Sequence, residues 1–232
     1  MNYTFDLEPR VTVPVAGSDA AFPVRRIYCV GRNYAAHARE MGFDPDREPP
    51  FFFCKPDNAV VVVPDGQTVE VAYPSMTTEY HHEIELVAAI GKAGRDIPVA
   101  RANEHVYGYA VGLDMTRRDL QLKLRDKGRP WELGKAFDQS APIAALYPAA
   151  QIGHPTRGAI WVQVDGQDRQ RSDIAKLIWS VPEIIANLST WFELRPGDLI
   201  YTGTPEGVGA LQRGQTLRGG IDGLGELQVK VV

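Results

Sequence analysis

The sequence has few of the features that identify a secreted, membrane or zinc-binding protein at once. It contains only two cysteines, Cys29 and Cys54, both in apolar runs typical of strands, so we expect reduced, buried thiols and no disulfide. No apolar run approaches the length of a membrane span. The N-terminus lacks the basic and then apolar pattern of a signal peptide, so we expect a cytoplasmic protein.

Charge of one sign is not in excess either. The 232 residues carry a formal net charge of −4 with both signs interspersed, so neither nucleic acid nor an anionic membrane is expected as a partner. A hydrophobic content of 44% with 23% charged residues is the ordinary balance of a globular protein with a substantial core. Without repeats or linkers, we expect an N-terminal extension over 1–24 and one domain over 25–232.

Short strand patterns outnumber helices, which favours a β-rich α+β fold over an alternating array of strands and helices. Helices are expected over 34–41, with Asn33 as N-cap, over 116–126 and over 181–192. The apolar stripe of the last helix is interpreted as core and comprises Ile184, Ile185, Leu188, Trp191 and Phe192. Strand patterns cover 26–31, 51–56, 60–63, 66–71, 83–90, 106–113 and 159–165.

Two carboxylates begin a strand that continues into the core. Side chains alternate between the faces of a strand, so Glu83 and Glu85 project side by side, ahead of the apolar run 86–90. Buried like charges are costly without a partner, and a divalent cation is the simplest remedy. Asp114, which follows the apolar strand 106–113, is the third candidate ligand. Three hard oxygen ligands without a nearby cysteine favour Mg²⁺ or Mn²⁺ over zinc.

The alternative is a pair of exposed glutamates at a rim, paired with lysine or arginine. If the metal is present, three carboxylates and one divalent cation sum to −1, so an anionic substrate needs further cations. Arg118, Lys135 and Arg32 are the nearest candidates, although each has the alternative of being an ordinary solvated cation. Gln121 lies three residues after Arg118 and therefore on the same face of the helix predicted over 116–126.

His37 and Glu40 form a candidate acid–base pair. They are three residues apart in a predicted helix and therefore neighbours on one face, where the carboxylate orients the imidazole and raises its basicity. The alternative is an ordinary surface ion pair. Residues 42–50 are rich in proline and cannot continue the helix, so we expect the short helix to act as a lid.

The glycine-rich loop 203–209 is a candidate carboxylate-binding segment. Its backbone N–H groups and the hydroxyl of Thr204 are suited to receive a substrate carboxylate. It is not a phosphate-binding loop, because no Gly-Lys-Ser/Thr sequence closes it and no helix is predicted to follow.

Five segments taken together resemble the fumarylacetoacetate hydrolase superfamily, in which they occur in the same order. The resemblance runs from about residue 25 to the C-terminus and is greatest with the acylpyruvate branch; residues 22–53 are similar to bacterial enzymes that hydrolyse fumarylpyruvate in the gentisate pathway. The segments are Gly-Arg-Asn-Tyr-Ala-Ala-His-Ala-Arg-Glu at 31–40, His-His-Glu-Ile-Glu-Leu at 81–86, Asp-Met-Thr-Arg-Arg-Asp-Leu-Gln at 114–121, Gly-Lys-Ala-Phe-Asp at 134–138 and Pro-Gly-Asp-Leu-Ile-Tyr-Thr-Gly-Thr-Pro at 196–205.

The resemblance implies a mixed β-roll fold, usually in a homodimer, with Mg²⁺ or Mn²⁺ on the three acidic residues named above. It also implies that His37 and Glu40 activate water from a lid and that Lys135 stabilises developing negative charge. Arg118 and Gln121 match positions near the bound substrate.

The activity that the resemblance implies is hydrolysis of a carbon–carbon bond in an acylpyruvate, a small diketo acid. We expect 3-fumarylpyruvate as substrate, with fumarate and pyruvate as products of aromatic degradation. Acylpyruvases of other substrate length and oxaloacetate decarboxylases occur in the same branch and stay as alternatives, as does a metal-binding module without catalysis. A distal fumaryl carboxylate needs a cation at the far end of the pocket, for which Arg32, Arg39 and Arg47 are candidates.

Overall fold

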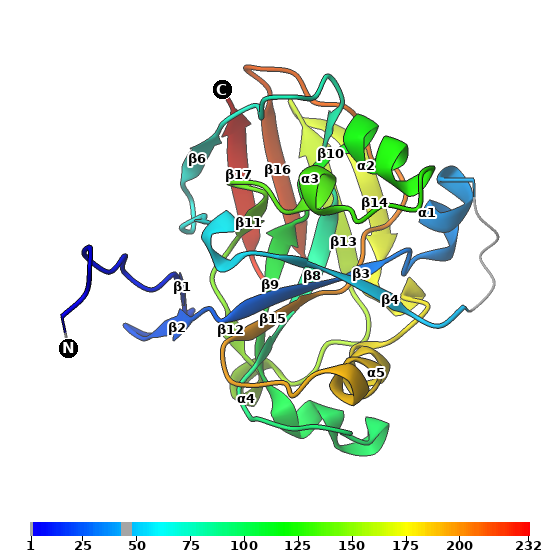
Figure 1. The fold of residues 1–232 in the computed structure, drawn as a ribbon. Coiled ribbons are helices and arrows are strands. Elements are labelled where there is room, and N and C mark those ends of the chain that lie inside the picture. Colours follow the sequence, from blue (N-terminus) through cyan, green and yellow to red (C-terminus); the bar gives the residue numbers. More distant parts are fainter. Residues whose placement is uncertain (1, 43–47) are drawn as a thin grey trace.

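The structure, a computed structural model, describes residues 2–42 and 48–232. Two sheets dominate it (Figure 1). The larger, eight-stranded sheet has the order β4-β3-β15-β8-β9-β11-β5, with β12 paired to β9, and the five-stranded sheet has the order β14-β13-β16-β17-β6. Pairing is mixed, because β15 is parallel to β3 and antiparallel to β8. The predicted β-rich α+β architecture is confirmed.

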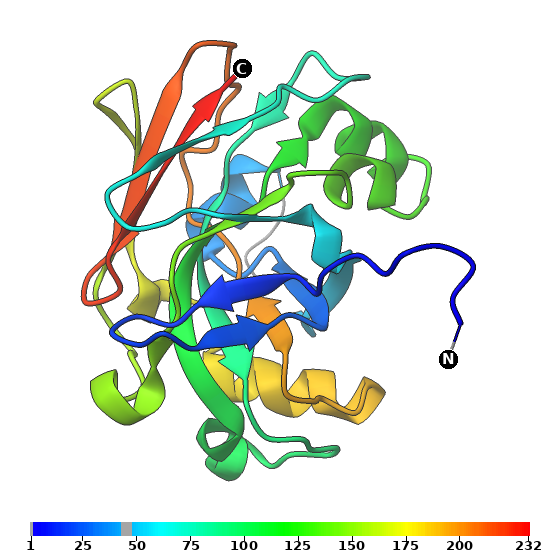
Figure 2. The ribbon, with the colours of Figure 1, turned by 90° about the vertical axis from the view of Figure 1, so that its left-hand side faces the viewer.

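The helices lie at opposite ends of the sheets, with α2 and α3 at one end and α4 and α5 at the other (Figures 1 and 2). The helices are α1 Ala35–Glu40, α2 Arg118–Arg125, α3 Glu132–Lys135, α4 Ala149–Ile152 and α5 Val181–Trp191, with 3₁₀ turns over Asp57–Ala59, Val99–His105 and Ile174–Lys176. The strands are β1 Thr12–Pro14, β2 Ala21–Pro23, β3 Arg26–Gly31, β4 Phe51–Lys55, β5 Val60–Val62, β6 Thr68–Val71, β7 Tyr80–His81, β8 Ile84–Ile90, β9 Val106–Leu113, β10 Thr116–Arg117, β11 Ala141–Ile143, β12 Tyr147–Pro148, β13 Ala159–Val164, β14 Gln167–Asp173, β15 Asp198–Tyr201, β16 Thr216–Ile221 and β17 Glu226–Val231.

The central strand β8 is buried along its whole length and contributes to two cores. Its even-numbered side chains, such as Leu86, join Val162 and Leu217 of the five-stranded sheet in the larger core. Its odd-numbered side chains, such as Val87, enter a second core on the opposite face of the larger sheet. This alternation decides the face on which any polar residue at the start of β8 must lie.

The N-terminal region contributes to the second core. β1 and β2 form an antiparallel hairpin that lies against the larger sheet, and the segment before β1 points away from it (Figure 2). Val13 and Phe22 of the hairpin are buried, together with Val15 and Val24. Burial of four large apolar side chains stabilises the face of the sheet that also carries the site described below.

Three local expectations from the sequence are wrong. Cys54 is exposed and not buried, because β4 is the edge strand of its sheet. The stripe of α5 is core only as far as Leu188, since Trp191 is 70% exposed and Phe192 is 37% exposed. Asn33 does not cap α1; its side chain donates to the carbonyls of Trp179 and Thr202 and accepts from the N–H of Trp179. These long-range bonds displace the local cap.

Among the described residues, no helix is both long and apolar enough to cross a membrane.

Candidate active site

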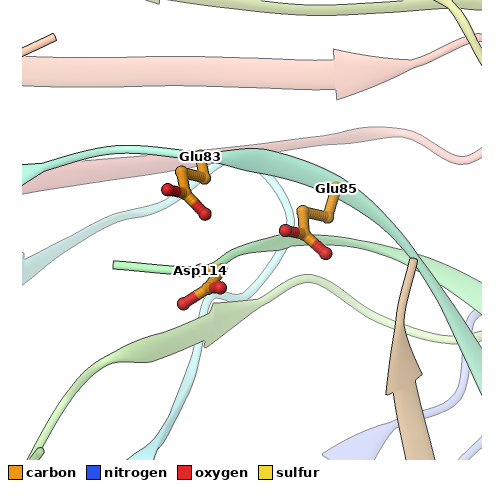
Figure 3. Close-up of side chains that lie close together, drawn as sticks. All are labelled: Glu83, Glu85 and Asp114. Carbon is orange, nitrogen blue, oxygen red and sulfur yellow. The ribbon is translucent and has the colours of Figure 1, made fainter. Parts of the chain in front are cut away.

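Three buried carboxylates meet where β8 begins and β9 ends. The two strands are antiparallel, with Glu85 opposite Gly112, and alternation places Glu83 on the same face as Glu85. Asp114 directly follows β9, and its N–H donates to the carbonyl of Glu83 at 2.9 Å. One ligand oxygen of each carboxylate lies within 4.8 Å of the other two (Figure 3). The exposed fractions are 5% for Glu83, 2% for Glu85 and 1% for Asp114, so the three residues do not form an exposed rim.

Two glycines lie beside Glu85 in the fold. A Cβ at Gly112, on the facing strand, would come within 2.6 Å of the Val87 side chain and 2.7 Å of the Tyr201 ring. Gly203 adopts a φ of 101°, a conformation that favours glycine, and its N–H donates to Oε2 of Glu85 at 2.7 Å. Glycine at 112 therefore leaves room for Val87 and Tyr201 beside the paired strands, and glycine at 203 permits the turn whose N–H binds Glu85.

Three buried cations contact two of the carboxylates. Lys135 Nζ donates to Oε2 of Glu83 and Oδ2 of Asp114, both at 2.7 Å. Arg118 donates to Oε1 of Glu83. Lys55 Nζ lies 2.8 Å from Oδ1 of Asp114, in an ion pair that lacks the alignment of a hydrogen bond. The basic partners anticipated in the alternative interpretation are therefore present, although in the interior and not at a rim.

Glu85 is the carboxylate that these cations leave uncompensated. Within the described part of the chain, no lysine, arginine or histidine forms an ion pair with it. Burial raises the pKa of Glu85 well above its ordinary value, and the charges of Asp114 and Glu83 raise it further. For Glu83 burial also raises the pKa, but the charges of Lys135 and Arg118 outweigh burial and hold the pKa well below its usual range.

This set of donors fits a hard divalent cation. All three candidate ligands are carboxylates, which Mg²⁺ and Mn²⁺ prefer. Among the described residues, Glu85 accepts a hydrogen bond only from the Gly203 N–H, and Oδ1 of Asp114 is buried without a hydrogen bond. An ion between the three residues would therefore compensate the charge of Glu85 and give Oδ1 of Asp114 a partner in addition to Lys55.

His37 and Glu40 lie in contact on α1. Nδ1 of His37 is 3.0 Å from Oε2 of Glu40, and Oε1 of Glu40 accepts from the N–H of Gly207 at 3.0 Å. Burial raises the pKa of Glu40, but the bonds from His37 and Gly207 outweigh it, so the net pKa is lowered. An ionised Glu40 holds a proton on Nδ1, which leaves Nε2 of His37 as the proton acceptor. His37 is 6% exposed.

One pocket is lined by His37 and by the three carboxylates. It measures about 470 Å³ including its open mouth, and the predicted substrate-binding residues Arg32, Arg118, Gln121 and Thr204 all line it. The Thr204 hydroxyl donates to the carbonyl of Ile84 and accepts from a glutamine side chain, so it holds the glycine-rich loop against β8.

Of the other two candidates for a distal cation, the structure describes only Arg39. Arg39 is an exposed residue of α1 and is not among the residues that line the pocket. Arg47 lies outside the described residues, as does most of the loop predicted to flank the lid.

Sequence reasoning missed three residues of this region. Lys55 ends an aromatic strand, a pattern that equally suits an exposed lysine. Gln170 is fully buried and accepts from the N–H of Ile84 while donating to Thr204 and to the carbonyl of Pro205, and no local pattern indicates these contacts. Arg125 lines the pocket and could have been found, because it follows Arg118 by two helical turns.

The fold and this site agree with comparisons with known proteins. The family model of the fumarylacetoacetate (FAA) hydrolase C-terminal domain matches residues 26–232, so the chain belongs to this family. This result confirms the resemblance inferred from the five sequence segments.

Particular relatives are similar over nearly the whole chain. The crystal structure of fumarylpyruvate hydrolase from Pseudomonas aeruginosa in complex with Mn²⁺ and pyruvate has a TM-score of 0.98 and 69% identity, and covers 100% of this chain and 99% of that one. The fumarylpyruvate hydrolase of Ralstonia sp is 49% identical over 81% of this chain and 95% of its own length. The mitochondrial oxaloacetate tautomerase FAHD1 of Arabidopsis thaliana is 42% identical over 89% of this chain and 90% of its own length.

Proposed function

We propose that the chain is a metal-dependent hydrolase that cleaves the carbon–carbon bond of an acylpyruvate, with 3-fumarylpyruvate as substrate. The observation that carries the proposal is the shared pocket, in which Glu85 and two other buried carboxylates face the same space as His37, whose Nδ1 contacts Glu40. The names of the Pseudomonas aeruginosa and Ralstonia relatives support the substrate.

Glu83, Glu85 and Asp114 would hold Mg²⁺ or Mn²⁺, and the Mn²⁺ complex of the Pseudomonas aeruginosa relative supports this choice. When bound, the ion supplies Lewis-acid polarisation of the 2-oxo acid and neutralises charge on the departing pyruvate. The charges of the three carboxylates cancel those of Lys55, Lys135 and Arg118. A divalent cation would thus leave a charge of +2, which matches the two carboxylates of fumarylpyruvate.

The side chains of this pocket would carry the proton transfers. Glu40 fixes the ring of His37, and Nε2 of His37 takes a proton from a water molecule that attacks the carbonyl carbon of the fumaryl group. Lys135, 2% exposed, stabilises the negative charge on the tetrahedral oxyanion. The carbon–carbon bond then breaks, fumarate leaves, and the proton held by His37 passes to the methylene carbon, which becomes the methyl group of pyruvate.

A panel of 2,4-diketo acids that differ only in the distal group tests this proposal. Loss of the enol absorbance is followed with Mn²⁺, with Mg²⁺ and with EDTA. We expect the highest kcat/KM with fumarylpyruvate, and loss of activity in EDTA that added Mn²⁺ restores. A higher kcat/KM with acetylpyruvate would refute the substrate and keep the reaction, whereas no cleavage of any member would refute the reaction.

A second candidate is decarboxylation of oxaloacetate, which is favoured by the similarity to the mitochondrial oxaloacetate decarboxylase of Dictyostelium discoideum, 41% identical over 86% of this chain and 90% of its own length. Decarboxylation produces the same pyruvate enolate but needs no attacking water. A His37→Ala variant should therefore retain most decarboxylation and lose hydrolysis if both reactions occur at this site. Equal loss of both activities would remove the second candidate.

The wider setting of the enzyme is also proposed. We infer a cytoplasmic homodimer that acts in aromatic catabolism, with one catalytic domain over 25–232 after the extension 1–24. Sedimentation equilibrium tests the assembly, and a mass of one chain at micromolar concentration would refute the dimer.

A further inference from the structure

One face of α2 runs outward along the pocket from the carboxylates. Four residues of this helix line the pocket, Arg118, Gln121, Leu122 and Arg125, with the i, i+3, i+4, i+7 spacing of a single helical face. Arg118 contacts Glu83 at the inner end. Arg125 comes seven residues later, which corresponds to about 10 Å along the helix axis. The helix therefore presents a second guanidinium at the outer end of the pocket.

Arg32 also lines this pocket, directly after β3. Its backbone has a φ of 56°, an uncommon conformation for a residue other than glycine, and its guanidinium carbon is 5.3 Å from the centroid of the Phe51 ring. Burial lowers the pKa of Arg32, the charge of Glu48 opposes this change, and the charge of Arg125 lowers the pKa further. The two arginines thus lie within electrostatic reach of each other, and an anion between them would interact favourably with both.

We propose that Arg125 and Arg32 form a subsite for the distal carboxylate of a dianionic diketo acid. The inference rests on the proposed function, which places the pyruvyl end beside the three carboxylates. The six carbon–carbon bonds of extended fumarylpyruvate, about 1.5 Å each, span roughly 7 Å, so the far carboxylate comes within reach of an Arg125 side chain whose backbone lies about 10 Å along the helix.

The contact of Arg125 with Asp126 is compatible with this role. Its Nε and one terminal nitrogen donate to Oδ1 of Asp126 at 2.9 and 2.8 Å, and the two side chains are 30% and 63% exposed. A solvent-exposed pair of this kind contributes little free energy, and a guanidinium has donors on more than one edge. Leu122 and Trp131 line the same pocket and offer apolar surface to the carbon chain between the two carboxylates.

The test compares two substrates that share the pyruvyl end. Fumarylpyruvate carries the distal carboxylate, whereas acetylpyruvate ends in a methyl group. For Arg125→Met, we expect kcat/KM for fumarylpyruvate to fall about 10- to 100-fold, mostly through a higher KM, because one charge-assisted hydrogen bond is lost. The value for acetylpyruvate should change by less than about twofold. Arg32→Met should show the same selectivity.

Lys123→Met is the matched control, because it removes one positive charge from an exposed position of the same helix. It should leave both substrates unaffected. Equal losses on both substrates in Arg125→Met, or no loss on either, would overturn the subsite while leaving the hydrolase proposal intact. If the wild-type enzyme with Mn²⁺ cleaved neither compound, the proposed function would fall and the subsite with it.

Discussion

Replacing Glu85 with Gln should change the stability of the protein in opposite directions with and without metal. The substitution keeps the shape of the side chain, and the amide oxygen can still accept from the Gly203 N–H, which lies 2.7 Å from Oε2 of Glu85. It removes a negative charge that is buried beside Asp114 and Glu83. Without metal this buried charge destabilises the folded protein, whereas with metal the carboxylate is a ligand of the ion.

The pH dependence gives the sign in the metal-free protein. Burial and two neighbouring carboxylates raise the folded-state pKa of Glu85 above its value of 4.5 in the unfolded chain. Above pH 4.5 the folded state therefore binds more protons than the unfolded state, so the free energy of unfolding falls as the pH rises toward the folded-state pKa. A glutamine at position 85 does not ionise, so it does not contribute this fall in the free energy of unfolding. In EDTA at pH 8, Glu85→Gln should be more stable than wild type by about 1–3 kcal/mol, and the difference should shrink toward pH 4.5.

Added Mn²⁺ should reverse the order. At 100 times its dissociation constant, a ligand specific to the folded state raises the free energy of unfolding by about 2.7 kcal/mol, and the variant should gain much less at the same concentration. Urea unfolding followed by tryptophan fluorescence measures the free energy of unfolding in EDTA and with Mn²⁺. Glu70→Gln, at a side chain that is 65% exposed, is the control and should match wild type in both conditions. An equal gain from Mn²⁺ in wild type and Glu85→Gln, or a variant less stable than wild type in EDTA, would refute the reasoning.

Further substitutions test the surroundings of the site. Gly207→Ala should lower kcat without weakening Mn²⁺ binding. Gly207 has a φ of 93°, and a new Cβ would lie 2.0 Å from the Arg169 carbonyl oxygen, so the substitution should displace the Gly207 N–H that binds Glu40. An unchanged kcat would contradict this prediction. Lys55→Met should lower the free energy of unfolding in EDTA by about 3–5 kcal/mol in urea titrations, since it leaves a buried carboxylate without one partner, and a loss under about 1 kcal/mol would count against the ion pair. Deletion of residues 1–24 should lower the melting temperature, because four buried apolar side chains are lost, and an unchanged value would show that the hairpin is dispensable.

The part of the site that follows from local patterns could be predicted from the sequence. Alternation along one strand and the end of a second strand suffice to nominate Glu83, Glu85 and Asp114, because β-strand geometry fixes the face of each side chain. The pairing of His37 with Glu40 likewise follows from helical spacing.

Contacts between distant segments could not be predicted in this way. The partners of Lys55 and Gln170 lie 59 or more and 34 or more residues away, so no spacing rule applies to them. The predictions that Cys54 and Trp191 are buried were wrong for a related reason. Periodicity identifies an apolar face but not the neighbouring element that covers it. Whether β4 is an edge strand, and whether the end of α5 is covered, is decided only when the sheets and helices are assembled.

The most direct test of the metal site is to count bound Mn²⁺ and measure fumarylpyruvate hydrolysis in the same EDTA-dialysed samples as the ion is added back. We expect bound Mn²⁺ and the hydrolysis rate to rise together and to saturate at a single ion per chain, with both lost in Glu83→Gln. Full hydrolysis in samples without a bound divalent ion would contradict the claim that the three carboxylates act by holding one.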